Sequence, residues 1–140
     1  MPKPQSCLHI HIKLDWSEQD LFGHINNVSF FKYIQAARVN FWKESGVWKN
    51  TNQRPDKGPL LASTYCDFKK PLHYPGSLDV YSSTGEVRNS GFEIIHQLKD
   101  EKGGLVATGR DVAVYFDYLK GAKTALSEEI KENLKQYQLN

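Results

Sequence analysis

Hydrophobic and polar residues alternate strictly near the start of the chain. From Leu8 to Asp15 an apolar side chain occupies every second position, which is the period of a β-strand with one exposed face. His9 and His11 share that exposed face. Because no third ligand is visible nearby in the sequence, we interpret the two histidines as solvated side chains and predict no metal site.

A helical spacing replaces this alternation after a polar loop at residues 17–25. It predicts one long helix from Asn26 or Asn27 to about Ser45, ended by Gly46. At about 100° per residue, roughly half of the circumference is apolar, a breadth that suits a helix wrapped by a curved sheet. The apolar arc contains Phe30, Phe31, Tyr33, Ile34, Ala37, Phe41 and Trp42, and the opposite side carries Ser29, Lys32, Asn40 and Lys43.

Two ionisable side chains fall on apolar rows. Arg38 lies inside the helical arc, where a partly buried guanidinium needs a carboxylate or carbonyl partner, and we interpret it as a structural residue. His96 shares a strand row with Phe92, Ile94 and Leu98, which favours a hydrogen-bonded histidine of the core or of an interface over a catalytic one.

Strand patterns dominate the second half of the chain. A short amphipathic helix follows Ser127 at the C-terminus. The connections between strands are too short for parallel crossovers, so the order of elements predicts a single α+β domain over residues 1–140 with an antiparallel sheet. The strands are predicted at about residues 60–69, 77–88, 92–99 and 104–118, with turn residues at the junctions HYPG, RNSG and DEKGG.

Length, charge and cysteine content exclude several classes of protein. A chain of 140 residues is one domain, too small for a large two-domain enzyme. The net charge of +2 comes from dispersed residues and provides no broad surface for nucleic acid. No apolar stretch reaches the about 18 residues of a membrane span, and we find no secretory signal, so we expect a cytoplasmic protein with no membrane partner. Cys7 and Cys66 are interpreted as reduced packing residues.

The candidate chemistry lies in the segment SEQDLFGHINN, residues 17–27. Gly23 permits a sharp turn or the close approach of a substrate. If Asn26 or Asn27 caps the helix, the following amides are unpaired at the positive end of the helix dipole and can polarise a carbonyl oxygen. Asp20, held nearby, could then attack the carbonyl carbon or activate a water. From these residues alone, a capping loop without catalytic function is the simpler interpretation.

The same segment resembles a known family. DLFGHINN, followed by VSFFKYIQAARVNFW and preceded by an alternating strand, is similar to the hotdog-fold acyl-CoA thioesterases of the 4-hydroxybenzoyl-CoA thioesterase family. That family carries D-x-x-G, often continued as G-H-V-N-N, before an aromatic-rich central helix. The resemblance covers about residues 8–118, including FKKPLHYPGSLDVYS. It implies a hotdog fold, an antiparallel sheet wrapped around one long central helix, and hydrolysis of a thioester to a free carboxylic acid and coenzyme A.

The resemblance also implies roles for individual residues. Asp20 matches the catalytic carboxylate, acting as nucleophile or general base, and the backbone amide of Asn27 matches the group that polarises the thioester carbonyl. His24 occupies the histidine variant of the motif and is expected to orient Asp20 or to contact substrate. The expected substrate-binding residues are Gly23 as the close-packed turn glycine, Asn26 as the cap, and Val28.

The resemblance gives further expectations about the central helix and about partners. Other hotdog branches carry a catalytic glutamate on that helix, but the only candidate here, Glu44, lies at its far end and is assigned no role. The expected partners are an acyl-CoA substrate and further copies of the chain in a homodimer or homotetramer whose site lies between subunits, with no cofactor besides the coenzyme A of the substrate. The candidate cations for binding coenzyme A at the rim of the site are Lys69, Lys70, Arg88 and Arg110. All four are explained equally well as solvated charges on strands.

Two alternatives remain open at this point. One is a thioesterase that acts on acyl carrier protein, and the other is a non-catalytic acyl-binding hotdog domain. The aromatic residues near the motif, Phe22, Phe30, Phe31 and Tyr33, could line a slot for the acyl group, but at helical spacing such residues more often belong to the core.

Overall fold

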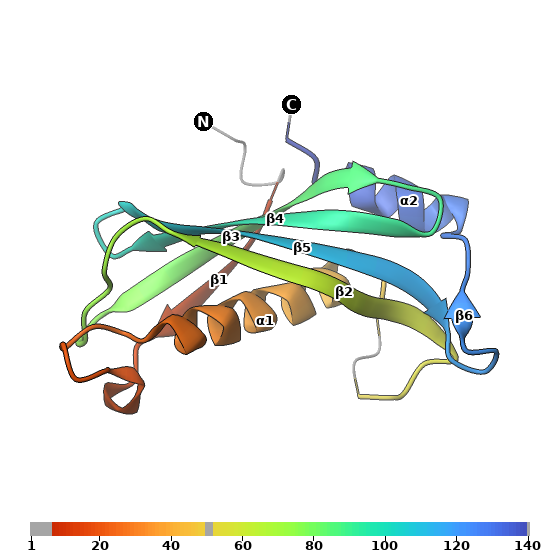
Figure 1. Ribbon diagram of the computed structural model, residues 1–140. Helices are drawn as coiled ribbons and strands as arrows, with labels where there is room; N and C mark the ends of the chain where they lie inside the picture. The colour runs from red at the N-terminus through yellow and green to blue at the C-terminus, as the bar shows by residue number, and fades with distance from the viewer. Residues whose placement is uncertain (1–6, 50–51, 140) are drawn as a thin grey trace.

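The computed structural model describes residues 7–49 and 52–139, and it confirms the expected order of one strand, one long helix, four long strands and a terminal helix (Figure 1). A 3-10 turn and a two-residue strand were not predicted. Residues 50–51 of the expected polar loop lie outside the described residues. The elements are β1 (Leu8–Lys13), η2 (Trp16–Glu18), α1 (Asn27–Glu44), β2 (Lys57–Phe68), β3 (Ser77–Val87), β4 (Gly91–Asp100), β5 (Leu105–Asp117), β6 (Ala122–Lys123) and α2 (Glu128–Lys135).

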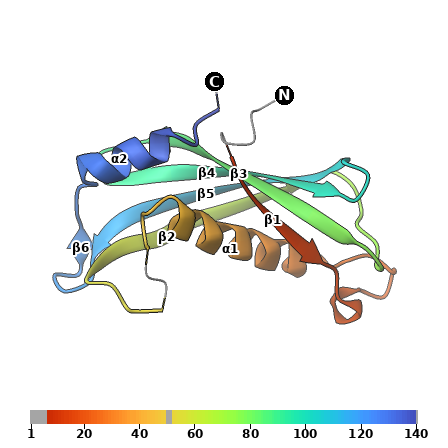
Figure 2. The same cartoon turned by 180° about the vertical axis from the view of Figure 1, so that it is seen from behind.

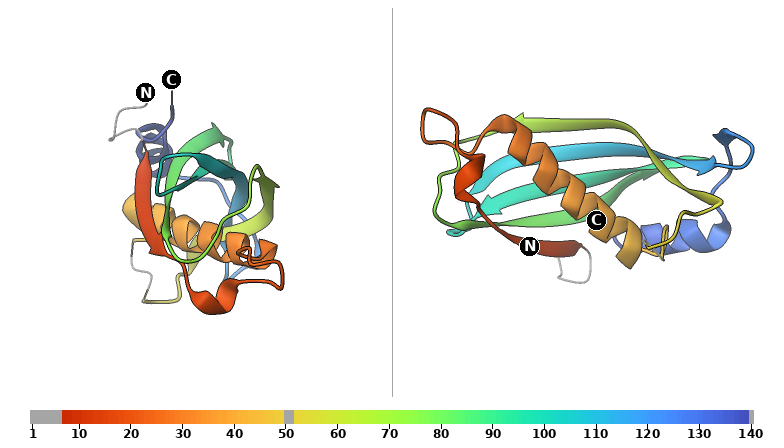
Figure 3. Two further views of the ribbon diagram at one scale, coloured as in Figure 1. Left: turned by 90° about the vertical axis from the view of Figure 1, so that its left-hand side faces the viewer. Right: turned by 90° about the horizontal axis from the view of Figure 1, so that it is seen from below.

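The strands form one antiparallel sheet in the order β1-β3-β4-β5-β2, with β6 paired to β5. Viewed along its length and from below, the sheet curves around α1, which runs obliquely across its concave face (Figure 3). β1 forms one edge of the sheet, and Figure 2 shows it passing beside α1. This is the predicted α+β arrangement, an antiparallel sheet wrapped around one long helix.

The junctions between strands differ in kind. RNSG and DEKGG close the hairpins β3–β4 and β4–β5. HYPG does not close a hairpin, because β2 lies at one edge of the sheet and β3 is separated from it by β4 and β5. The chain therefore crosses the end of the sheet between β2 and β3, and this crossing brings residues 69–76 next to the loop that precedes α1, where the Ile25 amide donates to the Leu72 carbonyl oxygen at 2.7 Å.

The buried face of α1 differs from the predicted arc at two positions. Ser29, placed on the polar side, is buried because it begins the row that continues through Tyr33 and Ala37 at a spacing of four residues. Phe31, placed in the arc, is 37% exposed and packs its ring edge-on against Phe68 of β2. The position on the helix decided burial in both cases, more than the polarity of the side chain.

The core holds the sheet close to the helix. Around Ile34, which is completely buried, pack apolar residues of β1, β3, β4 and β5. Gly109 of β5 lies directly beneath this contact, since a Cβ added there would lie 2.9 Å from the Ile34 Cδ1 atom. A side chain at position 109 would require the Ile34 side chain to shift within the packed core.

A polar cluster, buried except for Thr64, ties α1 to four strands. Asp111 on β5 accepts from Arg38 Nη1 at 3.2 Å and from Thr64 Oγ1 at 2.6 Å, and its Oδ2 lies 2.9 Å from His96 Nε2. Ser82 Oγ lies 2.7 Å from His96 Nδ1. Arg38 thus has the carboxylate partner that the sequence requires, and the prediction of a hydrogen-bonded His96 is confirmed.

Ser82, His96 and Asp111 form a chain of the kind that serine hydrolases use, but it lies inside the core. The three residues are 2%, 0% and 0% exposed, so a substrate has no access to the Ser82 hydroxyl. Burial acts to raise the pKa of Asp111, but the hydrogen bonds from His96 and Thr64 and the charge of Arg38 outweigh it and lower that pKa below its ordinary value. We assign this cluster to stability.

The remaining sequence predictions concern side chains outside the core. His9 and His11 lie on the exposed face of β1, and both imidazoles are within hydrogen-bond distance of one oxygen of Asp79, at 2.6 and 2.9 Å. Cys7 and Cys66 are both free thiols, as predicted. Neither helix in the described part of the chain is long and apolar enough to cross a membrane.

Candidate active site

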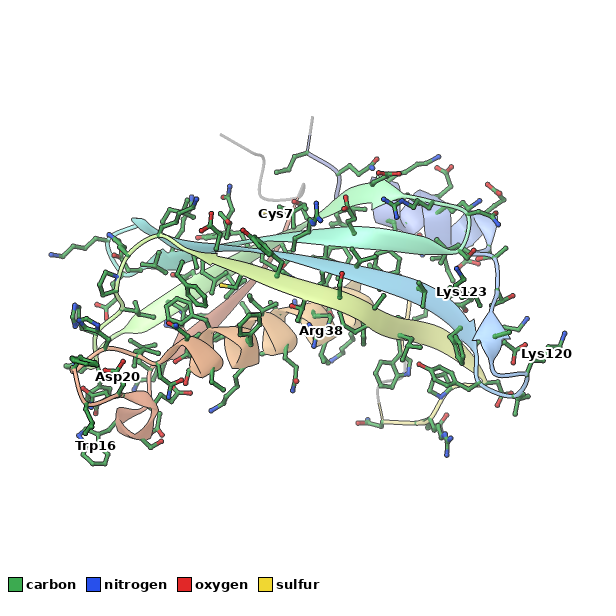
Figure 4. All side chains as sticks on the ribbon, viewed as in Figure 1. Cys7, Trp16, Asp20, Arg38, Lys120 and Lys123 are labelled. Carbon is green, nitrogen blue, oxygen red and sulfur yellow. The ribbon has the colours of Figure 1, made fainter. Side chains whose placement is uncertain are left out.

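The segment between β1 and α1 folds into a compact loop at one end of the molecule. Figure 4 shows Trp16 and Asp20 at this end, far from Lys120 and Lys123. Gln19 and Ile25 form an isolated β-bridge that closes the loop. Inside it, the Asp20 amide donates to the His24 carbonyl oxygen at 2.7 Å, and the Gly23 amide donates back to the Asp20 carbonyl oxygen at 3.1 Å. Asp20 is therefore presented on a tight, hydrogen-bonded turn.

The carboxylate of Asp20 is oriented by backbone amides of its own turn. Its Oδ1 accepts from the amides of Phe22 at 2.9 Å and His24 at 3.1 Å, the local pattern of an Asx turn. No donor among the described residues bonds Oδ2, and Asp20 is exposed. One oxygen is thus fixed in place while the other remains available to a substrate or a water.

The start of α1 supplies unpaired donors beside this carboxylate. Asn26 is the N-cap, and its side-chain oxygen accepts from the Ser29 amide at 2.9 Å. Within the described residues, the amides of Asn27 and Val28 have no acceptor. Because these amides stand at the positive end of the helix dipole, they form a place where a carbonyl oxygen or a developing oxyanion can bind.

Gly23 and His24 complete the turn in different ways. Gly23 has a φ of +79°, which disfavours any residue with a side chain, yet a Cβ there would meet nothing within 4 Å. The backbone conformation at position 23 therefore requires glycine. Close packing against other residues of the chain does not require it. The imidazole of His24 packs edge-on against His73, with ring centroids 4.9 Å apart, and His73 Nδ1 lies 3.3 Å from the Gly23 carbonyl oxygen.

A cavity of about 310 Å³ lies between the loop, the start of α1 and the end of β2. Three of the predicted site residues line it, whereas Gly23, Asn26 and Val28 lie beside it and not in its wall. The polar lining is Asp20, His24, Asn27, Lys69 and Lys70, and the apolar lining is Ile25, Phe30, Phe68 and Pro71.

The structure separates the four candidate rim cations into two groups. Lys69 and Lys70 line the cavity, where their ammonium groups lie 2.6 Å from Asp67 and 3.0 Å from Asp100. Arg88 lines a different cavity of about 230 Å³ at the β3–β4 turn, at the other end of β3. Arg110 lines a third cavity, with Tyr65 and Ile95. Only the two lysines lie near Asp20.

A family model now identifies the chain. The model of the thioesterase-like superfamily matches residues 14–134, which is most of the sequence. The chain belongs to this superfamily. The membership confirms the resemblance to the hotdog-fold thioesterases and places the protein among the thioester hydrolases.

Relatives and solved structures agree with this membership of the thioesterase-like superfamily. The "Uncharacterized protein YsmA" of Bacillus subtilis is 27% identical over 123 residues, which cover 88% of this chain and 82% of YsmA. A structure from Bacillus stearothermophilus described as a "predicted thioesterase" aligns with a TM-score of 0.84 at 21% identity, covering 96% and 98% of the two chains. The 1,4-dihydroxy-2-naphthoyl-CoA thioesterase of Synechocystis aligns with a TM-score of 0.79 at 15% identity, covering 92% and 96%. At these identities the two structures support the shared fold alone.

In this thioesterase-like protein, the sequence reasoning missed Glu18 and His73. The spacing of Asp15 and Glu18 is that of a capping box, and the Asp15 amide does donate to Glu18 Oε1 at 3.1 Å. That local signal could have revealed the turn, but not the contacts of Glu18 with α1. His73 reaches the site only because the β2–β3 connection crosses the end of the sheet, which no local pattern indicates.

Proposed function

We propose that the protein hydrolyses acyl-CoA thioesters at the cavity beside Asp20. The observation that carries the proposal is the meeting, in one cavity, of an oriented carboxylate and a helix start with unpaired amides. Family membership supports the reaction type. The names of two structural neighbours, a 1,4-dihydroxy-2-naphthoyl-CoA and a gentisyl-CoA thioesterase, favour coenzyme A as the carrier.

The proposed reaction follows from the positions of these groups. The thioester carbonyl oxygen accepts hydrogen bonds from the Asn27 and Val28 amides, which stabilise the negative charge that develops on it. Asp20 either attacks the carbonyl carbon directly or removes a proton from the water that attacks it. When Asp20 attacks, the carbon–sulfur bond breaks to give a mixed anhydride, which a water molecule then hydrolyses; when water attacks, the bond breaks to give the acid at once. On either route the thiolate of coenzyme A takes up a proton and the acyl group leaves as a carboxylic acid.

The cavity wall also suggests how the two parts of the substrate are bound. Phe30 and Phe68 provide an apolar surface for the acyl group, their rings packed edge-on with centroids 5.2 Å apart. Lys69 and Lys70 provide positive charge for the phosphates of coenzyme A. To bind them, the two ammonium groups exchange their ion pairs with Asp67 and Asp100 for contacts with the phosphates. The imidazole of His24, which makes no hydrogen bond to the Asp20 carboxylate in the described structure, is assigned to substrate contact.

Hydrolysis of a panel of aromatic and fatty acyl-CoAs, followed by the release of free thiol, tests the proposal. The Asp20→Asn variant retains an oxygen that can accept from the Phe22 and His24 amides, so the turn should persist while the charge is lost. We expect kcat to fall by at least about a hundred-fold. Asp56→Asn, which changes an exposed carboxylate in the loop before β2, is the matched control and should keep the wild-type rate.

Two results would contradict the proposal: an inactive wild type across the panel, or an Asp20→Asn variant that keeps most of its rate. Binding of acyl-CoA without turnover, unaffected by Asp20→Asn, would instead favour a non-catalytic acyl-binding domain. A comparison of one acyl group on coenzyme A and on acyl carrier protein separates the two carriers.

A single turnover in heavy-oxygen water gives a positive test for the nucleophilic role of Asp20. A general base directs labelled water to the thioester carbon, so the label enters the released acid alone. A nucleophile forms a mixed anhydride, and opening of that anhydride at the aspartyl carbonyl leaves the label in Asp20. Label in a proteolytic peptide that contains Asp20 would therefore identify the nucleophilic route.

A further inference from the structure

Glu18 is a buried carboxylate in an otherwise exposed segment. Its neighbours Asp15, Trp16 and Ser17 are exposed, as are Asp20 and the next three residues, 21–23, but Glu18 is only 7% exposed. Glutamate is seldom buried unless its charge is paired, because removing a carboxylate from water costs several kcal/mol. The protein therefore holds this side chain inward through specific partners.

Those partners lie on the second turn of α1. Glu18 Oε1 accepts from the Tyr33 hydroxyl at 2.6 Å, and Oε2 accepts from Lys32 Nζ at 2.8 Å. Burial acts to raise the pKa of Glu18, but the bonds from Lys32, Tyr33 and the Asp15 amide outweigh it and lower that pKa. Burial and the neighbouring carboxylate raise the pKa of Tyr33. Near neutral pH the contact is thus an ionised carboxylate that accepts from a phenol and an ammonium group.

The backbone of Glu18 contacts the other end of the same loop. Its carbonyl oxygen accepts from the Asn26 amide at 2.9 Å, and the next residue, Gln19, forms the bridge with Ile25. Glu18 therefore joins the start of the Asp20 loop to the body of α1 through its side chain and to the helix cap through its backbone. The other described bonds between the segment that joins β1 to α1 and the rest of the fold run to Leu72, His73 and Gly76.

We propose that Glu18 is a positioning residue, which sets the place of the Asp20 carboxylate relative to the unpaired amides of Asn27 and Val28. This inference rests on the proposed function. Glu18 does not line the cavity and acts only through the loop that it anchors. Misplacement of a reacting group by about 1 Å can cost a hundred-fold in rate, so Glu18 should govern kcat more than substrate binding.

The test compares Glu18→Gln and Tyr33→Phe with wild type. Glu18→Gln keeps the size of the side chain but removes its charge, and it leaves one acceptor oxygen in place of the two that accept from Lys32, Tyr33 and the Asp15 amide. We expect kcat to fall by about ten- to a hundred-fold while KM stays within about two-fold. The double variant should fall little below Glu18→Gln alone, because both substitutions act on one contact.

Ser82→Ala is the matched control. It removes the buried 2.7 Å contact with His96 in the core and does not touch the loop. The variant should lose stability and keep its kcat, which separates a loss of positioning from a general loss of stability.

Amide hydrogen exchange of Phe22 and His24, followed by NMR without substrate, gives a second readout. These amides bond the Asp20 carboxylate, so their exchange should be faster in Glu18→Gln than in wild type and unchanged in Ser82→Ala. Wild-type kcat in Glu18→Gln, a rise in KM alone, or unchanged exchange would each overturn the inference. If the wild type hydrolyses no acyl-CoA, the proposed function fails, whereas the exchange rates still decide whether Glu18 orders the loop.

Discussion

Asp111 joins the central helix to the sheet through one carboxylate, which makes its ionisation a determinant of stability. Its partners Arg38, Thr64 and His96 come from α1, β2 and β4. Removing the charge leaves the Arg38 guanidinium buried and uncompensated. We expect Asp111→Asn to lower the free energy of unfolding by about 3 kcal/mol near neutral pH, measured by urea denaturation.

The pH dependence of this difference follows from the lowered pKa of Asp111 in the folded protein. The ionised form favours folding, so its contribution is complete above the ordinary carboxyl pKa of about 4 and is lost as the pH falls through the lower, folded value. The gap between wild type and Asp111→Asn should therefore narrow below pH about 4. A gap that stays constant, or widens, as the solution is acidified would show that the ionised carboxylate is not what stabilises the fold.

The two helix caps offer a comparison between a stabilising role and a catalytic one. Asn26 caps α1 through the Ser29 amide, and Ser127 caps α2 through the Ile130 amide at 3.2 Å. Replacement of either cap by alanine should destabilise the protein by about 1 kcal/mol. Only Asn26→Ala should also lower kcat, because only α1 begins at the cavity with Asp20.

Thermal unfolding and acyl-CoA kinetics of Asn26→Ala and Ser127→Ala make this comparison. Asn26→Asp retains a capping oxygen and should recover most of the stability. Equal kcat values in the two alanine variants would mean that the start of α1 contributes nothing beyond a helix end.

The elements that the sequence predicted are those with a strong local signal. β1 was visible as a strict alternation, and α1 as a capped aromatic stripe ended by Gly46, which has a φ of +82°. β6 has two residues and carries no periodicity. The order of the strands, and with it the crossing of the β2–β3 connection, depends on tertiary pairing that turn residues do not encode.

The candidate site divides in the same way. Asp20 and the cap of α1 could be located because they lie within eight consecutive residues that resemble a family motif. Lys69 and Lys70 could be named only among four equal candidates, because their distance from Asp20 is set by the fold. The contact of Glu18 with Tyr33 joins residues 15 positions apart, and no spacing rule connects a loop carboxylate with a helical tyrosine.

The two edges of the sheet differ in what they expose, which bears on how the whole molecule associates. β1 is a short edge of six residues with His9, His11 and Lys13 on its exposed face. β2 is an edge of twelve residues on which Leu60 and Tyr65 are 39% and 60% exposed. A long apolar edge is a template for pairing with another strand, whereas charged side chains block it. We therefore predict a homodimer in which β2 is the edge that pairs with a second copy of the chain.

Light scattering after size exclusion should give a mass of at least twice that of one chain, with a homotetramer formed from two such dimers as the larger form. The double variant Leu60→Lys, Tyr65→Lys places like charges along the β2 edge and should shift the protein toward the monomer. His11→Lys, the matched change on the β1 edge, should leave the mass unchanged. If the site lies between subunits, the rate per chain should fall together with the dimer fraction of the β2 variant. A monomeric wild type would show that β2 forms no interface in solution. A β2 variant that keeps the wild-type mass would show that the copies associate through another interface.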